Sequence, residues 1–201
     1  TLGTPQGLAF DSQGNLFIAS ARNRIRKISS AGIATNFAGN GTAGTTGDGG
    51  LATAAALSAP FGLNLNSAGE LFFTENGGHT VRKISTDGII SKVAGTGTSG
   101  SSPHSLQATL TSLNAPTTIR FLNSGDMYVV DAGNGLIRRI ASDGNSYRFI
   151  GSLPKAGFAG DGGHATQSNL NSPNHVHAAL NGEIVISDGG NNRIRKILTN
   201  G

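Results

Sequence analysis

Two histidines separated by a single residue lie in the segment PNHVHAA, and they are the first candidates for chemistry in this sequence. If the segment is a β-strand, His175 and His177 share one face, because side chains alternate between the two faces of a strand. Two imidazoles on one face can supply half of a tetrahedral site for zinc or a similar metal ion. The elements that would position this pair must therefore be identified next.

A glycine pattern, G-x-G-x-x-G, occurs at residues 39–44 and again at residues 95–100. This spacing is typical of loops that bind a dinucleotide, where the loop opens directly into a helix. Here the second copy continues as SSPHS, which does not start a helix cleanly. The two copies are 56 residues apart, so we interpret them as linker loops of a repeat and not as a nucleotide site.

The 201-residue chain repeats itself from one end to the other. Four segments of the form L-x-x-P have prolines 55, 56 and 57 residues apart, at Pro5, Pro60, Pro116 and Pro173. Four basic segments have arginines 56, 56 and 57 residues apart, at Arg26, Arg82, Arg138 and Arg195. Two independent markers with one period indicate a single repeat domain, with units at 2–56, 57–112, 113–169 and an incomplete unit at 170–201.

Each repeat contains short apolar runs separated by turn residues, as in GLAFD, NLFIAS, RIRKIS and IATNFAG of the first unit. Such runs, bounded by glycine, asparagine and aspartate, predict β-strands joined by tight turns. The composition agrees, because 31 residues are glycine and only 13% are charged. We therefore expect an all-β protein, a β-propeller of four-stranded antiparallel blades with about four blades in this chain.

The third strand of each repeat is basic, which suggests either a polyanion surface or a scaffold contact. The repeated arginines share a strand face with isoleucines, and a carboxylate occupies a matched place in the preceding strand of three repeats, namely Glu75, Asp131 and Asp188. The first repeat has Ser20 at this place. We favour bidentate arginine–carboxylate pairs within each blade. RNA binding through phosphate contacts is an alternative, although the chain has no tryptophan and two tyrosines to stack on bases.

Alignment of the repeats on their prolines places His175 and His177 in a first strand, which lines the central channel of a propeller. Arg120 and Asn64 occupy the position of His177 in neighbouring repeats. The channel is therefore a candidate site for an anion or a metal, formed by His175, His177, Arg120 and Asn64. The alternative is that these polar residues simply line a wet channel.

Two further acids, Asp48 and Asp161, lie in the linker motif GDGG. Calcium needs several oxygen ligands, and one aspartate per loop is too few. We expect each of these carboxylates to bond nearby backbone amides in a turn.

The repeat resembles the NHL repeat, on the segments PQGLAFD, GNLFIA and NRIRKI of the first unit and GEIVISDGGNNRIRKI of the last. The linkers GDGGLATAAALSAP and GDGGHATQSNLNSP resemble those of the longer NHL repeats in some bacterial, plant and teneurin-like proteins. The resemblance covers essentially the whole chain and implies a propeller. It does not imply one function, because members of the family bind proteins, bind RNA or act as lyases.

The last repeat ends at TNG, the turn that precedes each fourth strand, so we expect the last blade to lack its outer strand. Exposed apolar faces on the end blades favour self-association that completes a ring, such as a homodimer, over a closed four-bladed ring or an open fragment of a longer propeller.

Three functions remain open at this point. The leading hypothesis is a non-enzymatic binding module that presents loops, such as residues 98–106, to a protein or glycan partner. The second is a metal-dependent lyase or hydrolase that uses the channel residues, and the third is RNA binding. We expect neither a membrane partner nor a cofactor. An Asn-Gly-Thr sequon at Asn40 permits glycosylation, and an extracellular or secreted location is favoured without being determined.

Overall fold

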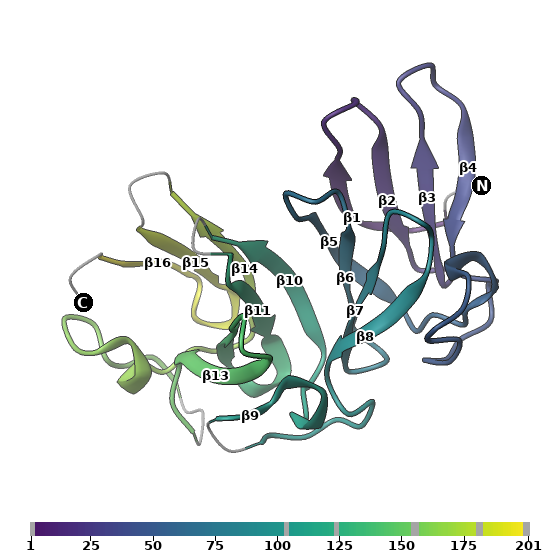
Figure 1. The fold of residues 1–201 in the computed structure, drawn as a ribbon. Coiled ribbons are helices and arrows are strands. Elements are labelled where there is room, and N and C mark those ends of the chain that lie inside the picture. Colours follow the sequence, from purple (N-terminus) through teal and green to yellow (C-terminus); the bar gives the residue numbers. More distant parts are fainter. Residues whose placement is uncertain (1–2, 103–104, 123–124, 154–156, 180–182, 199–201) are drawn as a thin grey trace.

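Four antiparallel β-sheets follow one another in chain order around an open arc (Figure 1). This computed structural model describes residues 3–102, 105–122, 125–153, 157–179 and 183–198. Each sheet is one blade of a β-propeller, and within a blade the strands lie side by side in sequence order. The predicted all-β propeller fold is confirmed. Within the described ranges, no helix is long and apolar enough to span a membrane.

The blades have the following strands. The first contains β1 (Pro5–Phe10), β2 (Leu16–Ser20), β3 (Arg24–Ile28) and β4 (Ala34–Ala38). The second contains β5 (Pro60–Leu65), β6 (Leu71–Glu75), β7 (Thr80–Ile84) and β8 (Ile90–Ala94). The third contains β10 (Pro116–Phe121), β11 (Met127–Asp131), β12 (Leu136–Ile140) and β13 (Asn145–Ile150), with the short β9 (Leu106–Gln107) on its outer edge. The fourth contains β14 (Pro173–Ala178), β15 (Ile184–Asp188) and β16 (Arg193–Ile197).

Short turns and one-turn helices join these strands. In the first turn of blade 1, Asp11 accepts hydrogen bonds from the amides of Gln13 and Asn15, and Asn66 makes the corresponding bonds in blade 2. These bonds show why aspartate and asparagine begin the turns. The 3-10 helices are η1 (Ala52–Ala54), η2 (Ala108–Leu110), η3 (Ala132–Asn134), η4 (Ala165–Gln167) and η5 (Gly189–Asn191).

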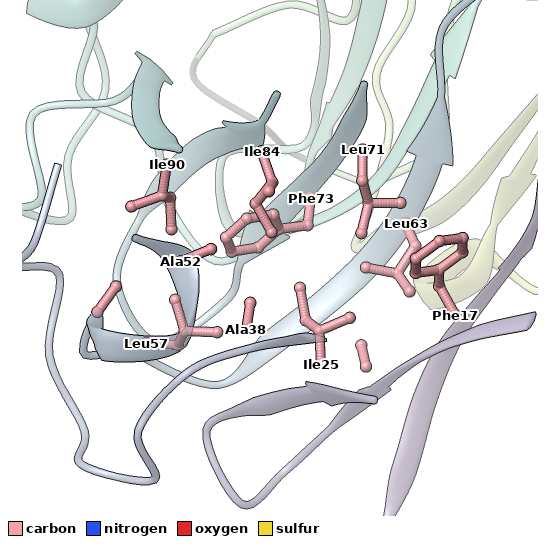
Figure 2. Packing of buried hydrophobic residues seen from close by; sticks show 12 residues of the cluster. Phe17, Ile25, Ala38, Ala52, Leu57, Leu63, Leu71, Phe73, Ile84 and Ile90 are labelled. Atoms are coloured by element: carbon pink, nitrogen blue, oxygen red, sulfur yellow. The ribbon is translucent and has the colours of Figure 1, made fainter. Parts of the chain in front are cut away.

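The hydrophobic core is divided into three clusters, and each lies between two neighbouring blades. Figure 2 shows the first, in which Phe17 and Ile25 of blade 1 pack against Phe73 and Ile84 of blade 2, while Leu57 from the linker closes one side. The strand alternation explains this arrangement, because each strand turns apolar side chains to both neighbours. Each blade is thus stabilised by the next one along the chain.

The inner strands β1, β5, β10 and β14 lie against one another in turn around the concave side of the arc. Between the first three blades the approach is too close for side chains. A Cβ atom on Gly7 would lie 2.0 Å from the carbonyl oxygen of Phe61, and one on Gly62 would lie 2.1 Å from that of Thr117. Glycine is therefore required at both positions by the packing of backbone on backbone.

The outer faces of the first and last blades carry exposed apolar side chains. Ile194 is 71% exposed, whereas its counterparts Ile25, Val81 and Ile137 are fully buried against a following blade. On the first blade, Phe10 is 66% exposed, because no blade of the described chain packs against that face. The fourth blade has three strands among the described residues, as expected from the sequence.

Candidate functional site

The inner strands of all four blades converge on one concave pocket of about 310 Å³. Its walls are mostly uncharged and include Gln6 of β1, Phe61 and Leu63 of β5, and Asn174 of β14. Only Arg120 and His175 among its lining residues can carry a charge. The pocket therefore brings together two of the four channel residues that the sequence suggested.

Arg120 and His175 are in direct contact across the boundary between blades 3 and 4. The Arg120 Nη2 atom lies 3.2 Å from His175 Nε2, and Arg120 Nη1 donates to the carbonyl oxygen of Ile119 at 2.8 Å. A guanidinium group can only donate, so His175 Nε2 must accept and the imidazole proton must be on Nδ1.

A second polar contact orients the same imidazole. His175 Nδ1 lies 3.4 Å from Thr118 Oγ1, and the Thr118 hydroxyl donates to the carbonyl oxygen of Asn174 at 2.7 Å. One hydrogen-bond network thus crosses the boundary between blades 3 and 4, from Arg120 through His175 and Thr118 to the carbonyl oxygen of Asn174. It holds the guanidinium group at the edge of the pocket.

Both groups are only partly removed from water, and this partial burial shifts them toward their neutral forms. Removal from water lowers the pKa of Arg120, although an arginine still keeps its charge near neutral pH. Burial also lowers the pKa of His175, and the nearby charges of Arg120 and His177 lower it further. Near neutral pH the site therefore consists of a guanidinium cation beside a neutral imidazole.

The other two predicted channel residues take different places. Asn64 donates to the carbonyl oxygen of Ile119 at 3.2 Å, the same oxygen that Arg120 bonds, and so ties β5 to β10. His177 is exposed, as is His175, and it lies two residues beyond His175 on β14, outside the residues that line the pocket.

A metal site does not fit this arrangement well. Within the described ranges, no three His, Cys, Asp or Glu side chains are grouped so that they could hold a metal ion. In addition, the Arg120 cation lies against one of the two imidazoles and would repel a metal ion there. An anion fits the same groups better.

The repeated arginines and carboxylates meet on the outer side of the blades. The distance is 3.5 Å between Arg82 and Glu75, 2.8 Å between Arg138 and Asp131, and 3.7 Å between Arg195 and Asp188. None of these pairs is bidentate, contrary to our expectation, because other acceptors share each guanidinium group. In the first blade, where Ser20 replaces the carboxylate, Arg26 Nη2 instead donates to the carbonyl oxygen of Ala34 at 3.5 Å.

The carboxylates of these pairs also fasten the linkers. Glu75 accepts from the amide of Ser58, Asp131 from that of Asn114, and Asp188 from that of Asn171. The residue after each of these amides has a positive φ, at Ala59, Ala115 and Ser172. Burial raises the pKa of Glu75 and of Asp131, and the neighbouring arginines and hydrogen bonds oppose that shift.

Asp48 and Asp161 have a role that the sequence analysis missed. Asp48 accepts from Arg82 Nε at 3.0 Å, and Asp161 accepts from Arg195 Nη2 at 2.6 Å, in place of the backbone amides that we expected. Each aspartate lies 34 residues before its arginine, and this equal spacing was the signal in the sequence. The GDGG loop is therefore a clamp on the arginine of the following blade, which we call the arginine clamp.

The basic third strands offer little surface to a polyanion. Arg82 and Arg138 are buried, and Lys83, Arg139 and Lys196 have carboxylate partners in Glu70, Asp126 and Glu183. The buried guanidinium groups cannot reach a phosphate backbone.

The glycine pattern also has a structural explanation. Gly39 and Gly95 have positive φ, and a Cβ atom there would lie 2.2 Å and 2.3 Å from the carbonyl oxygens of Asn23 and His79. No α-helix follows either loop in the described ranges. These glycines allow the end of each fourth strand to pass close to a neighbouring turn.

A second cavity, of about 230 Å³, lies beside β16 and is lined by Ile186, Ile197 and the GDGG loop at residues 160–163. In blade 2 the corresponding space is filled by Ile90 of β8, whose backbone pairs with Gly49 and Gly50. This cavity therefore corresponds to a strand position of the blade and not to a ligand site.

No family model and no curated protein matches this chain. Several solved β-propeller structures do resemble it. A streptogramin B lyase superposes with a TM-score of 0.65 at 18% identity, over 98% of this chain and 52% of the lyase. An auxiliary nutrient binding protein from Bacteroides ovatus gives 0.73 at 16% identity, over 96% and 48%. A gluconolactonase from Xanthomonas campestris gives 0.66 at 13% identity, over 98% and 58%.

These similarities show the β-propeller fold, and at such low identity they show nothing of function. The chain spans about half the length of these proteins. The activities named for them therefore belong to those proteins.

Proposed function

We propose that this chain is a non-enzymatic binding module of the NHL-repeat type, which takes a group of a protein or glycan partner into its concave pocket. The observation that carries the proposal is the pocket itself, at which the inner strands of all four blades converge. The other strong sequence motifs are used within the scaffold, as the arginine clamp and the glycine loops illustrate. The pocket remains as the concave surface, with a few polar groups in apolar walls, that packing does not explain.

The loop at residues 98–106, of which residues 103 and 104 lie outside the described ranges, is a weaker candidate for the binding surface. The carbonyl oxygen of Gly100 accepts from Asn134, that of Ser102 accepts from Arg138, and Ser102 Oγ accepts from the amide of Ser112. In blade 3, which lacks GDGG, this loop thus contacts the repeated arginine. Its hydrogen bonds support a scaffold role, and the pocket is the better place for a partner.

The test is a screen of glycan and peptide arrays with three proteins. The variant Gln6→Trp fills the pocket mouth from an exposed position on β1, and Lys92→Trp places the same side chain at an exposed position on β8 as the control. We expect the ligands of the wild-type protein to be retained by Lys92→Trp and lost by Gln6→Trp. Equal binding by both variants would mean that the partner docks elsewhere.

A metal-dependent lyase or hydrolase is the second candidate, because two imidazoles lie on the inner strand of blade 4 and one similar structure is a streptogramin B lyase. This alternative predicts one tightly bound metal ion per chain, lost in a His175→Ala, His177→Ala double variant. Elemental analysis of the purified protein distinguishes it from a binding module.

The exposed faces of the first and last blades support self-association as a further part of this proposal. Each face is equivalent to one that is buried between blades elsewhere in the chain, so face-to-face contact between two copies would repeat an existing interface. Light scattering on a sizing column measures the mass directly. The mass of two chains, reduced to one by Ile194→Asp, is expected.

A further inference from the structure

Arg120, beside the pocket, lacks a carboxylate counter-ion within the chain. All 11 acidic residues of the chain lie in the described ranges, and none has a carboxylate oxygen within 4.0 Å of Arg120. The repeated arginines of blades 2 to 4, by contrast, all have carboxylate partners. A partly buried cation without a compensating charge is costly, and a bound anion would remove that cost.

The acids nearest in sequence to the inner strands are directed away from the pocket. They lie in the turns between first and second strands, where Glu70 pairs with Lys83 and Glu183 with Lys196. Asp126 approaches Arg139 in the same way, at 3.7 Å. The inner strands themselves contain no acid. Arg120 is therefore the only fixed charge on the described inner strands, and the pocket has a positive potential.

The shape of the pocket favours a compact ligand over an extended peptide. Neighbouring inner strands meet backbone to backbone at Gly7 and Gly62, which leaves no free strand edge between them for an added strand. The walls beside Arg120 combine apolar surface from Leu8 and Leu63 with amide groups from Gln6 and Asn174. Such walls suit one small organic unit with an uncharged body.

We propose that this pocket binds the carboxylate of a compact organic monocarboxylate, such as an acidic sugar unit, with Arg120 as the anchor. This deepens the proposed function and rests on it. Arg120 has donors beyond the two that bond Ile119 and His175, and a carboxylate accepts from a guanidinium group in the same plane. No bond is made or broken, so the step is binding alone.

Binding should take up a proton on His175. The charged and titratable groups that face His175 are Arg120 from β10 and His177 from β14 itself, while β1 and β5 contribute none. Both of those neighbours disfavour the imidazolium form. A bound carboxylate offsets them and favours the imidazolium form, in which His175 Nε2 donates to the carboxylate and no longer accepts from Arg120. Affinity should therefore rise as the pH falls from about 7.5 to about 5.5, around the ordinary pKa of histidine.

The test is isothermal titration of the wild-type protein with two matched pairs of probes, glucuronate with glucose and benzoate with benzamide. The carboxylate member of at least one pair should bind about tenfold or more tightly than its neutral partner, as expected for a charge-assisted hydrogen bond. Arg120→Gln should abolish this preference, and Lys92→Gln, which removes an exposed charge on β8, should retain it. His175→Gln should bind with little dependence on pH.

The two pairs of probes also distinguish the kind of group that carries the carboxylate. Preference for glucuronate indicates a sugar acid, and preference for benzoate indicates an aromatic acid. Equal affinity for the charged and neutral members of both pairs would overturn the inference, as would a carboxylate preference that persists in Arg120→Gln. If a neutral ligand from the array screen binds the wild-type protein and is lost by Gln6→Trp, the binding module stands and only the proposal of a carboxylate ligand is wrong. If nothing binds in the pocket, both proposals fail.

Discussion

Arg82 and Arg120 are two arginines of one propeller with opposite surroundings. On the outer side of blade 2, Arg82 meets the carboxylates of Asp48 and Glu75 and the carbonyl oxygens of Thr46 and Ala56. On the inner side of blade 3, Arg120 meets one carbonyl oxygen and one neutral imidazole. The first cation is compensated within the chain and stabilises the blade, whereas the second remains available to a ligand.

Charge type alone therefore does not identify a functional arginine in a repeat protein. The basic third strands are the most visible feature of the sequence, yet the described structure uses most of their charges internally. Arg120 lies at a position that does not follow the repeat, because the four units have Ala9, Asn64, Arg120 and His177 there. The departure from the repeat, and not the repeat itself, marks the candidate site.

The largest effect is expected from Arg82→Met, which keeps most of the side-chain volume and removes the charge. It leaves Glu75 buried without its cation, and loss of one partner of a buried pair costs about 3–5 kcal/mol of the free energy of unfolding. Urea denaturation measures this cost. Adding Glu75→Gln should recover part of it, because no unpaired buried charge then remains; a double variant as unstable as the single one would refute the pairing.

A smaller effect is expected at the loop side of the arginine clamp. Asp48 is 33% exposed and Asp161 is 63% exposed, so water screens the second pair more strongly. We expect Asp48→Asn to cost about 0.5–1 kcal/mol and Asp161→Asn to cost less. Thermal unfolding of the two variants in the same buffer compares them, and a larger loss for Asp161→Asn would contradict this account of the clamp.

Arg120→Gln should change stability by less than about 0.5 kcal/mol, or increase it slightly, because no carboxylate in the chain is left without a partner. Arg82→Met is expected to lower the free energy of unfolding strongly, whereas Arg120→Gln is expected to leave it nearly unchanged. Urea denaturation without ligand provides the measurement. A loss as large as that of Arg82→Met would show that Arg120 belongs to the scaffold.

The smallest effect is the pH dependence contributed by His175. The folded state lowers the pKa of His175, so the unfolded state binds the proton more readily below about 6.5. Its contribution to stability is therefore present above that pH and is lost as the pH falls below it. When urea denaturation is measured at several pH values, the free energy of unfolding should fall less with decreasing pH for His175→Gln than for the wild-type protein. The same pH dependence for both proteins would argue against a lowered pKa of His175.

Much of the fold was predictable because the repeat appears in two independent markers, the prolines and the arginines. The pairing of Arg138 with Asp131 followed from strand alternation, which places residues of one face at known intervals. The partners of Asp48 and Asp161 were not foreseen, because a local turn explains an aspartate beside glycines equally well. Only the equal spacing of 34 residues to each arginine distinguishes the two roles.

The candidate site was predicted in part. Alignment of the repeats puts Arg120 level with His177, yet Arg120 contacts His175. The reason is a stagger between neighbouring inner strands, also visible where Gly7 meets Phe61 and where Asn64 meets Ile119. The repeat period determines the position of a residue within its own blade and says nothing of the offset between blades. The lack of a counter-ion for Arg120 likewise depends on where every acid lies in space.

The availability of Arg120 to a ligand can be measured by observing its side chain while a carboxylate is added. The Nε–H resonance of Arg120, assigned by its absence from the spectrum of Arg120→Gln, can be followed by NMR during titration with glucuronate and with benzoate. The account predicts a saturable shift of this resonance with at least one carboxylate and none with its neutral partner, while the Arg82 resonance stays in place. An Arg120 resonance that does not move, or that moves equally with glucose or benzamide, would contradict it.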